Sequence, residues 1–134
     1  MRRSTRSISG AYDLAEQILE DSLADVEERF GGDLPLAEHL WVLGTTLDLN
    51  RRHARAEALL RRGAAIFEER LGSRSPSFAS CIATLASVLV WRSKLEEGER
   101  LLQRALAIHR AAGRPSDDVV DALNSLGWLY CHQR

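Results

Sequence analysis

Three glycine–proline loops divide the chain at nearly regular intervals. Pro35, Pro76 and Pro115 lie 41 and 39 residues apart, and each follows a glycine by a few positions. Glycine is the preferred residue just past the end of a helix, and proline is favoured in the first turn of the next one. The spacing therefore predicts helices joined by three equivalent loops, which indicates an internal repeat.

Aligning the chain with itself at this spacing matches apolar and small residues in one frame. The matched segments are 43–47 with 85–89, 59–66 with 101–108, 85–89 with 126–130, and 12–19 with 53–60. Each unit contains two stretches in which apolar residues recur at the period of one helix face. A small residue follows the central leucine of each first stretch (Gly44, Ala86, Gly127), where it allows two helices to approach closely.

The 134 residues suit a single domain, because domains cluster near about 100–150 residues. Residues 1–10 carry arginines and serines without an apolar pattern, so we expect a disordered basic tail there. Residues 11–134 then form one helical domain. Its expected parts are an N-terminal half repeat (11–34), two repeats (35–75 and 76–114) and a C-terminal half repeat (115–134).

The repeated strings are RRHARAEALLRRGAAIFEERLGSRSPSFASCIATLASVL and SKLEEGERLLQRALAIHRAAGRPSDDVVDALNSLGWLY. They resemble the tetratricopeptide repeat (TPR), in the 42-residue form of kinesin light chains and many bacterial proteins. The resemblance covers residues 11–134 and implies an all-α fold, a right-handed superhelix or α-solenoid of about two and a half repeats and six helices. Gly63 departs from the family's usual alanine, and the family's asparagine is present only as Asn124, with Trp41 and Ala83 at the equivalent places.

In the TPR family the first helix of each unit lines the concave side of the superhelix, where peptides or partner helices bind. Carried over by position, the resemblance implies a partner-binding surface made of Glu38, Trp41, Thr45, Asp48, Ser87, Asp121, Asn124 and Trp128, with Ser80, Ala83, Val90 and Cys131 beside them. Trp41 and Trp128 lie off the leucine face, and tryptophan is enriched at binding hot spots. The alternative is that either ring packs on a neighbouring unit.

The sequence holds few side chains that could perform catalysis. No two of the four histidines (His39, His53, His109, His132) lie four residues apart, and no glycine-rich phosphate loop is present. Two cysteines are too few for a cysteine-built zinc site, and we expect Cys81 to pack as a small hydrophobic residue. We therefore expect no enzyme, no catalytic residue, no metal and no cofactor.

Charge is segregated along the chain although the formal net charge is −1. Residues 11–50 hold ten acids and one base, residues 51–74 hold seven bases and three acids, and residues 92–114 hold six bases and three acids. One interpretation is solvated helix faces with local pairs such as Glu57 with Arg61. The other is an arginine ridge for an acidic peptide or phosphate. The small net charge argues against a nucleic-acid partner.

No apolar run approaches the ~18 residues that span a membrane, and the N-terminus lacks the apolar core of a secretory signal. The sequence therefore predicts a cytoplasmic protein without a membrane partner, and its arginine-rich, lysine-poor composition is typical of bacteria. The function that we expect is a protein–protein interaction scaffold that binds a protein or peptide. The alternative is a regulatory or sensor segment of a larger bacterial signalling or transcription-regulating protein.

The end of the chain carries more apolar groups than one neighbouring helix covers. They lie in a first-type helix expected at about residues 116–132: Val120, Leu123, Leu126, Trp128, Leu129 and Tyr130. Solenoids need polar capping units, and this end lacks one. Either the chain is part of a longer array, or it self-associates through this C-terminal helix, head to tail or as a symmetric dimer.

Overall fold

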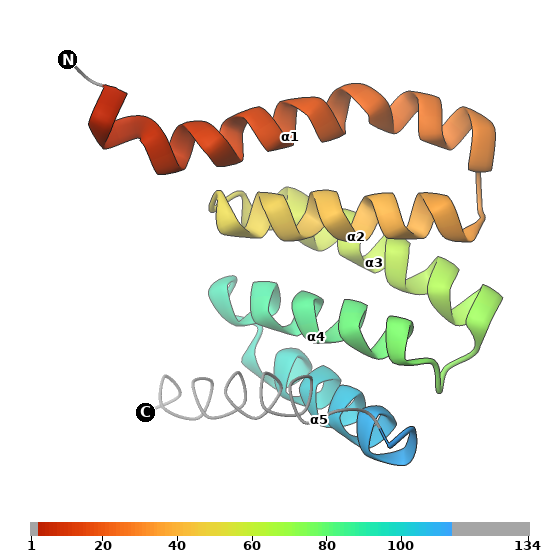
Figure 1. Cartoon of the computed structure of the whole chain (residues 1–134). Helices are drawn as coiled ribbons and strands as arrows, with labels where there is room; N and C mark the ends of the chain where they lie inside the picture. The colour runs from red at the N-terminus through yellow and green to blue at the C-terminus, as the bar shows by residue number, and fades with distance from the viewer. Residues whose placement is uncertain (1–2, 114–134) are drawn as a thin grey trace.

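The computed structural model describes residues 3–113, and these residues form five successive α-helices without a strand (Figure 1). The helices are α1 (Arg3–Phe30), α2 (Leu34–Leu49), α3 (His53–Leu71), α4 (Pro76–Trp91) and α5 (Leu95–Ala111). The all-helical prediction is thus confirmed for this part of the chain. The expected sixth helix and the C-terminal half repeat, residues 115–134, lie outside the described residues.

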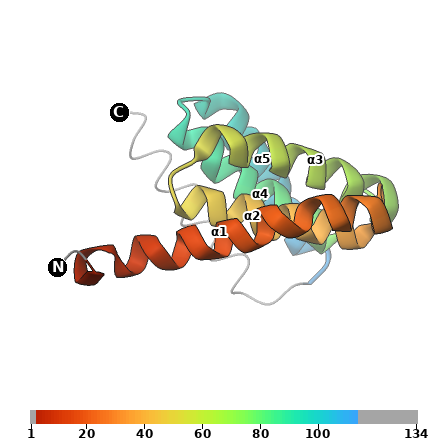
Figure 2. The ribbon, with the colours of Figure 1, turned by 90° about the horizontal axis from the view of Figure 1, so that it is seen from above.

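The helices form two layers in which neighbours in sequence pack side by side. We call α2 and α4 the first helices, and α1, α3 and α5 the second helices. In Figure 1, α1, α2 and α4 succeed one another down the molecule, while α3 lies behind α2. Seen from above, α3 and α5 lie together on the side away from α1 (Figure 2). Each first helix packs on the second helices before and after it.

The start of α1 differs from the sequence prediction. The expected boundary was a disordered tail over residues 1–10, but the helix already begins at Arg3. Residues 3–10 contain no proline, and serine and arginine are both compatible with a helix, so nothing in this segment stops the helix from extending toward the N-terminus.

The loops before the first helices follow the glycine–proline pattern. Asp33 caps α2, because its side chain accepts a hydrogen bond from the backbone N–H of Leu34 at 2.8 Å. Ser75 caps α4 in the same way through the N–H of Ser77, at 3.1 Å. The preceding Gly32 and Gly72 have positive φ angles of 77° and 94°, which glycine adopts without strain. The loop at Pro115 lies beyond the described residues.

The turns within the units are also equivalent, although they use no glycine. Arg51 and Ser93 both adopt φ 65°, a left-handed conformation that is uncommon for residues with a side chain. In each turn the following residue closes the helix end. The N–H of Arg52 donates to the carbonyl of Leu47, and the N–H of Lys94 donates to that of Leu89, both at 2.8 Å. The two units thus share one turn geometry.

Small residues let the helices of a unit approach closely, as the sequence predicted. A Cβ atom at Gly44 of α2 would lie 2.6 Å from Cγ of Leu60 in α3, which is too close for two carbon atoms. A Cβ atom at Gly63 would lie 3.4 Å from both the carbonyl oxygen of Ala37 and Cβ of Leu40, an ordinary contact. The leucines around this crossing are fully buried (Leu36, Leu40, Leu43, Leu47, Leu60). The crossing therefore sits in the middle of the core.

We expect Gly44→Leu to lower the free energy of unfolding by at least ~2 kcal/mol, because the new side chain must displace the buried Leu60. The control is Thr45→Leu, which places the same leucine side chain at the next, half-buried position of α2. Gly63→Ala is expected to raise the free energy of unfolding by up to ~1 kcal/mol, since alanine is the better helix former and its Cβ fits. Urea denaturation followed by circular dichroism measures all three. An unchanged midpoint for Gly44→Leu would contradict the tight crossing.

Candidate functional site

The structure describes five of the eight predicted partner-binding residues, and it divides them into two groups. Glu38, Thr45 and Ser87 lie toward the outer side of the first helices, where Glu38 is exposed and the other two are half-buried. Trp41 and Asp48 instead point toward neighbouring elements. The remaining three, Asp121, Asn124 and Trp128, lie outside the described residues, as does Cys131.

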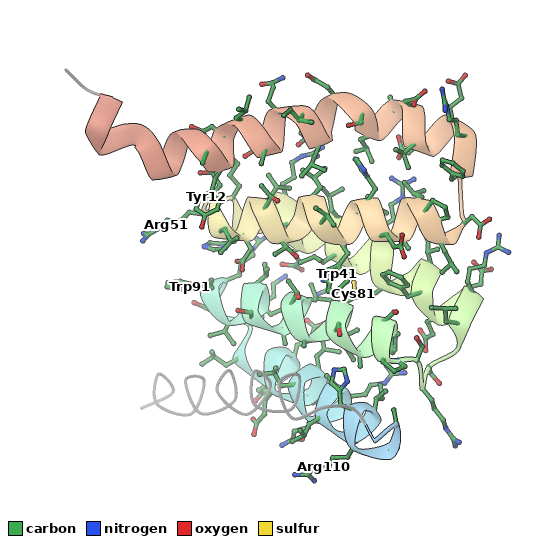
Figure 3. The ribbon with its side chains drawn as sticks, viewed as in Figure 1. Tyr12, Trp41, Arg51, Cys81, Trp91 and Arg110 are labelled. Carbon is green, nitrogen blue, oxygen red and sulfur yellow. The ribbon has the colours of Figure 1, made fainter. Side chains whose placement is uncertain are left out.

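Trp41 joins the two units. Its indole Nε1 donates a hydrogen bond to Oγ1 of Thr84 in α4 at 3.3 Å. The ring meets that of Phe67 in α3 edge to face, with 6.4 Å between the ring centroids. Figure 3 shows Trp41 and Cys81 between α2 and α4. This is the packing role that was the alternative to a binding hot spot at Trp41.

Asp48 anchors the start of α3. Its Oδ1 lies 2.9 Å from Nδ1 of His53, and the His53 ring stacks on Trp91 with the two planes parallel within 1° and the centroids 5.5 Å apart. Burial raises the pKa of Asp48 above its usual 3.8, against the opposing effect of His53. Asp48 and Trp91 are thus linked through His53, across the boundary between units.

Half of the residues on the outer side are predicted ones, and the others are shifted by one position, from Trp41 to Val42 and from Asp48 to Leu49. On α2 the outer residues are Glu38, Val42, Thr45 and Leu49, and the equivalent residues of α4, 42 positions later, are Ser80, Thr84, Ser87 and Trp91. We call these eight residues the first-helix face. Its apolar members are Val42, Leu49 and Trp91, with exposed fractions of 49%, 54% and 55%. Sequence reasoning missed all three; the available signal was that they fall between the buried leucines of the helix pattern.

The first-helix face is apolar near the turns and at Val42, and polar at its other positions. Thr45 and Thr84 donate their hydroxyl protons to backbone carbonyls of their own helices, at 2.8 and 3.1 Å. Their oxygen atoms can therefore accept hydrogen bonds but have no proton left to donate. No nucleophile with a neighbouring base occurs among these eight residues. The face can supply apolar contact area and hydrogen-bond acceptors.

Three of the four arginines of α3 pair with glutamates of the neighbouring second helices, while Arg70 contacts the loop before α2. Arg55 forms a bidentate pair with Glu20 of α1 at 2.6 Å, and Arg61 forms one with Glu97 of α5 at 2.9 and 3.0 Å. Further pairs of the same kind are Arg52 with Glu16, Arg62 with Glu27, and Arg104 of α5 with Glu68 of α3. The segregated charges of the sequence thus meet across units. This pairing argues against an arginine ridge that is open to phosphate.

The carboxylate of Glu57 in α3 binds residues of the turn between α4 and α5. It accepts hydrogen bonds from Nε of Arg61 at 3.0 Å and from Nζ of Lys94 at 3.0 and 3.3 Å, and it lies 3.4 Å from a guanidinium nitrogen of Arg92. The residue is only 7% exposed. Burial raises the pKa of Glu57, but the hydrogen bonds from Lys94 and Arg61 outweigh it and hold this pKa below its usual 4.5.

The same arrangement recurs one unit earlier. Glu16 of α1 accepts a hydrogen bond from Nδ2 of Asn50 at 2.9 Å and pairs with Nε of Arg52 at 3.0 Å. We call this contact the turn clamp: a glutamate of one second helix holds the turn before the next second helix. The sequence predicted only the local Glu57–Arg61 pair, although the match of Glu16 with Glu57 at the repeat spacing was a usable signal.

No reactive centre forms among residues 3–113. Cys81 is buried, its Sγ faces the carbonyl oxygen of Leu60 at 3.6 Å, and burial raises the pKa of its thiol to about 12. This agrees with a packed small residue. No group of three histidine, cysteine or carboxylate side chains gathers around a common point in this part of the chain. None of the described helices is long and apolar enough to cross a membrane.

Residues 36–77 and 78–112 match the model of the tetratricopeptide repeat family, and together they make up more than half of the chain. The chain belongs to the TPR family. The first match contains nearly all of α2 and all of α3, and the second contains nearly all of α4 and all of α5, so each match is essentially one pair of helices. TPR units generally mediate protein–protein interactions. No curated protein sequence matches the chain.

The turn clamp of this TPR protein predicts a large effect of Glu57→Gln. The substitution removes the negative charge that faces Arg61, Arg92 and Lys94, and the free energy of unfolding should fall by about 2 kcal/mol. Those cations are partly exposed and can be hydrated again, which keeps the loss below that of a fully buried pair. Glu69→Gln, at an exposed position of the same helix, is the control and should change little. Equal urea midpoints for the two variants would contradict the clamp.

The ion pairs also predict how the free energy of unfolding depends on pH. Hydrogen bonds from Arg55 and from Arg61 lower the pKa values of Glu20 and Glu97 respectively, and the pKa of Glu57 is lowered as well. A carboxylate with a lowered folded-state pKa contributes stability above its unfolded pKa, near 4.5, and loses it as the pH falls through the folded value. Urea midpoints should therefore fall steeply below about pH 4.5. A triple variant with Gln at 20, 57 and 97 should show a flatter profile.

Proposed function

We propose that the chain is a cytoplasmic interaction scaffold whose first-helix face binds an extended peptide or a helix of a partner protein. The observation that carries the proposal is the exposure of Val42, Leu49 and Trp91 on the helices that TPR units present to partners. Large apolar side chains that gather on one surface mark interaction sites.

The chemistry of the face indicates what the partner offers. Burying a valine or leucine side chain contributes about 1.5–3 kcal/mol of binding free energy. Burying two or three such side chains is therefore enough for a specific complex. Thr45 retains an acceptor oxygen that suits a backbone or side-chain N–H donor of the partner, whereas Oγ1 of Thr84 already accepts from Nε1 of Trp41. Because the arginines of α3 lie in ion pairs on the other layer of the molecule, an acidic partner gains little there. We therefore favour an apolar segment as the ligand of the first-helix face.

The proposal is tested with the full chain and a partner identified by cross-linking in cells. The double variant Leu49→Asp, Trp91→Ala removes the apolar end of the face, and affinity for the partner in isothermal titration calorimetry should fall at least ~30-fold, as for hot-spot residues. Leu71→Asp, at an exposed leucine at the end of α3, is the matched control and should bind like the unmodified chain. Trp91→Ala also removes the stacking on His53, so Leu49→Asp alone is the second variant; Trp41→Ala is not used, because it removes the contacts with Phe67 and Thr84. Unchanged binding by the folded double variant would place the site elsewhere.

A further inference from the structure

The two first helices carry almost no exposed charge. Residues 76–91, which form α4, include no charged side chain, and α2 includes Glu38, His39 and Asp48. His39 and Asp48 are half-buried and hydrogen-bonded to other helices. Glu38 is exposed, and its carboxylate has no partner within residues 3–113. Glu38 is therefore the one exposed charge of α2 and α4, and it lies near the start of α2.

The other end of the first-helix face lies beside a cation that no acid opposes. Arg51 follows the exposed Leu49 by two residues, in the turn after α2. Its guanidinium is exposed and has no partner in the described part of the chain. The remaining cations of the two turns all face glutamates of the turn clamp: Arg52, Arg92 and Lys94. Figure 3 shows Arg51 and Trp91 at the same end of the molecule.

These charges give the first-helix face a direction. Both α2 and α4 begin on the side of the glycine–proline loops and end on the side of the turns (Figure 1). Glu38 and Leu49 are 11 residues apart, which places them about 16 Å apart along the axis and within about 20° of one another around it. The face is thus negative at the loop side, and apolar with a neighbouring positive charge at the turn side.

The hydrogen-bonding groups of the face favour a helix over an extended segment. An extended peptide turns unpaired backbone N–H and C=O groups toward the surface that it covers, and these groups need partners. Thr45 and Thr84 have already donated their protons to their own helices, and Oγ1 of Thr84 accepts from Nε1 of Trp41. A helix pairs its own backbone groups except at its two ends. A helix therefore needs little from this face beyond apolar contact.

We propose that the partner segment is a helix that lies over α2 and α4 and parallel to them, with its N-terminus near Glu38 and its C-terminus near Arg51. This inference rests on the proposed function, because it takes the first-helix face as the site. The N-terminus of a helix carries partial positive charge and the C-terminus partial negative charge, so each end meets an opposite charge. A basic residue near the start of the partner helix and an acidic residue three turns later add to this match. Apolar residues toward its C-terminal end cover Leu49 and Trp91.

The test compares two fluorescein-labelled, hydrocarbon-stapled peptides of identical composition by fluorescence anisotropy with the full chain. The staple keeps both peptides helical, and leucines on the C-terminal half of one face fix their direction on the protein. The forward peptide has a lysine near its start and a glutamate 11 residues later, the spacing of Glu38 and Leu49, and the reverse peptide exchanges the two. We expect the forward peptide to bind at least about fivefold more tightly at low salt, because two attractive pairs become repulsive in the other. The difference should shrink at ~0.5 M salt.

Exchanging the charges of the protein should reverse this preference. The double variant Glu38→Lys, Arg51→Glu should bind the reverse peptide more tightly than the forward one. The matched control, Glu69→Lys with Arg110→Glu, makes the same exchange at exposed positions of α3 and α5 and should still prefer the forward peptide. A forward peptide with a central proline in place of the staple should bind at least about tenfold more weakly, because proline breaks the helix.

Leu49→Asp reports on the face itself and should weaken both peptides. Equal affinity of the two peptides, with binding still weakened by Leu49→Asp, would overturn the parallel helix and leave the first-helix face as the site. Undiminished binding of the proline peptide would show an extended ligand, and absence of saturable binding by both stapled peptides would exclude the helix as the ligand. Binding that Leu49→Asp leaves unchanged would overturn the first-helix face, and the helix with it.

Discussion

At Gly44 the backbone of α2 lies directly against the side chain of Leu60, with no room for even a methyl group in between. This close approach lets the leucines of α2 interdigitate with the apolar face of α3, so that the leucines at the crossing are fully buried. The second unit uses Ala86 and Leu102 at the same positions. Because the crossing recurs, the two units share one geometry. Each first helix lies between two second helices and keeps them apart.

The spacing between second helices explains the charge distribution of the chain. The backbones of α1, α3 and α5 do not approach one another closely, and long side chains bridge the distance between these helices. Arginine and glutamate reach across, as in Arg55 with Glu20 and Arg61 with Glu97. An exposed pair contributes only ~0–1 kcal/mol, but the nearly buried Glu57 is surrounded by three cations and fixes the turn of the next unit.

These two kinds of contact leave apolar side chains exposed on two surfaces. The ion pairs link α1, α3 and α5, and the exposed apolar groups of α2 and α4 are not among the residues of these pairs. The edge of α1 is the other surface. Ile18 and Leu59 occupy equivalent positions in the repeat, yet the first is mostly exposed and the second buried. The difference arises from the neighbour alone, because a first helix lies on Leu59 and none of the described helices lies on Ile18.

The sequence by itself determined the period of the repeat, the helix pairs, the glycine–proline loops and the small residues at the crossings. These features are local: turn residues and helix periodicity act within a few positions of themselves. Only the tertiary structure decided that Val42 and not Trp41 faces outward, because one residue turns a helix position by about 100° and the neighbouring helices fix the direction. It also decided the partners of the arginines, which lie about one repeat away in the chain and meet only when the units stack.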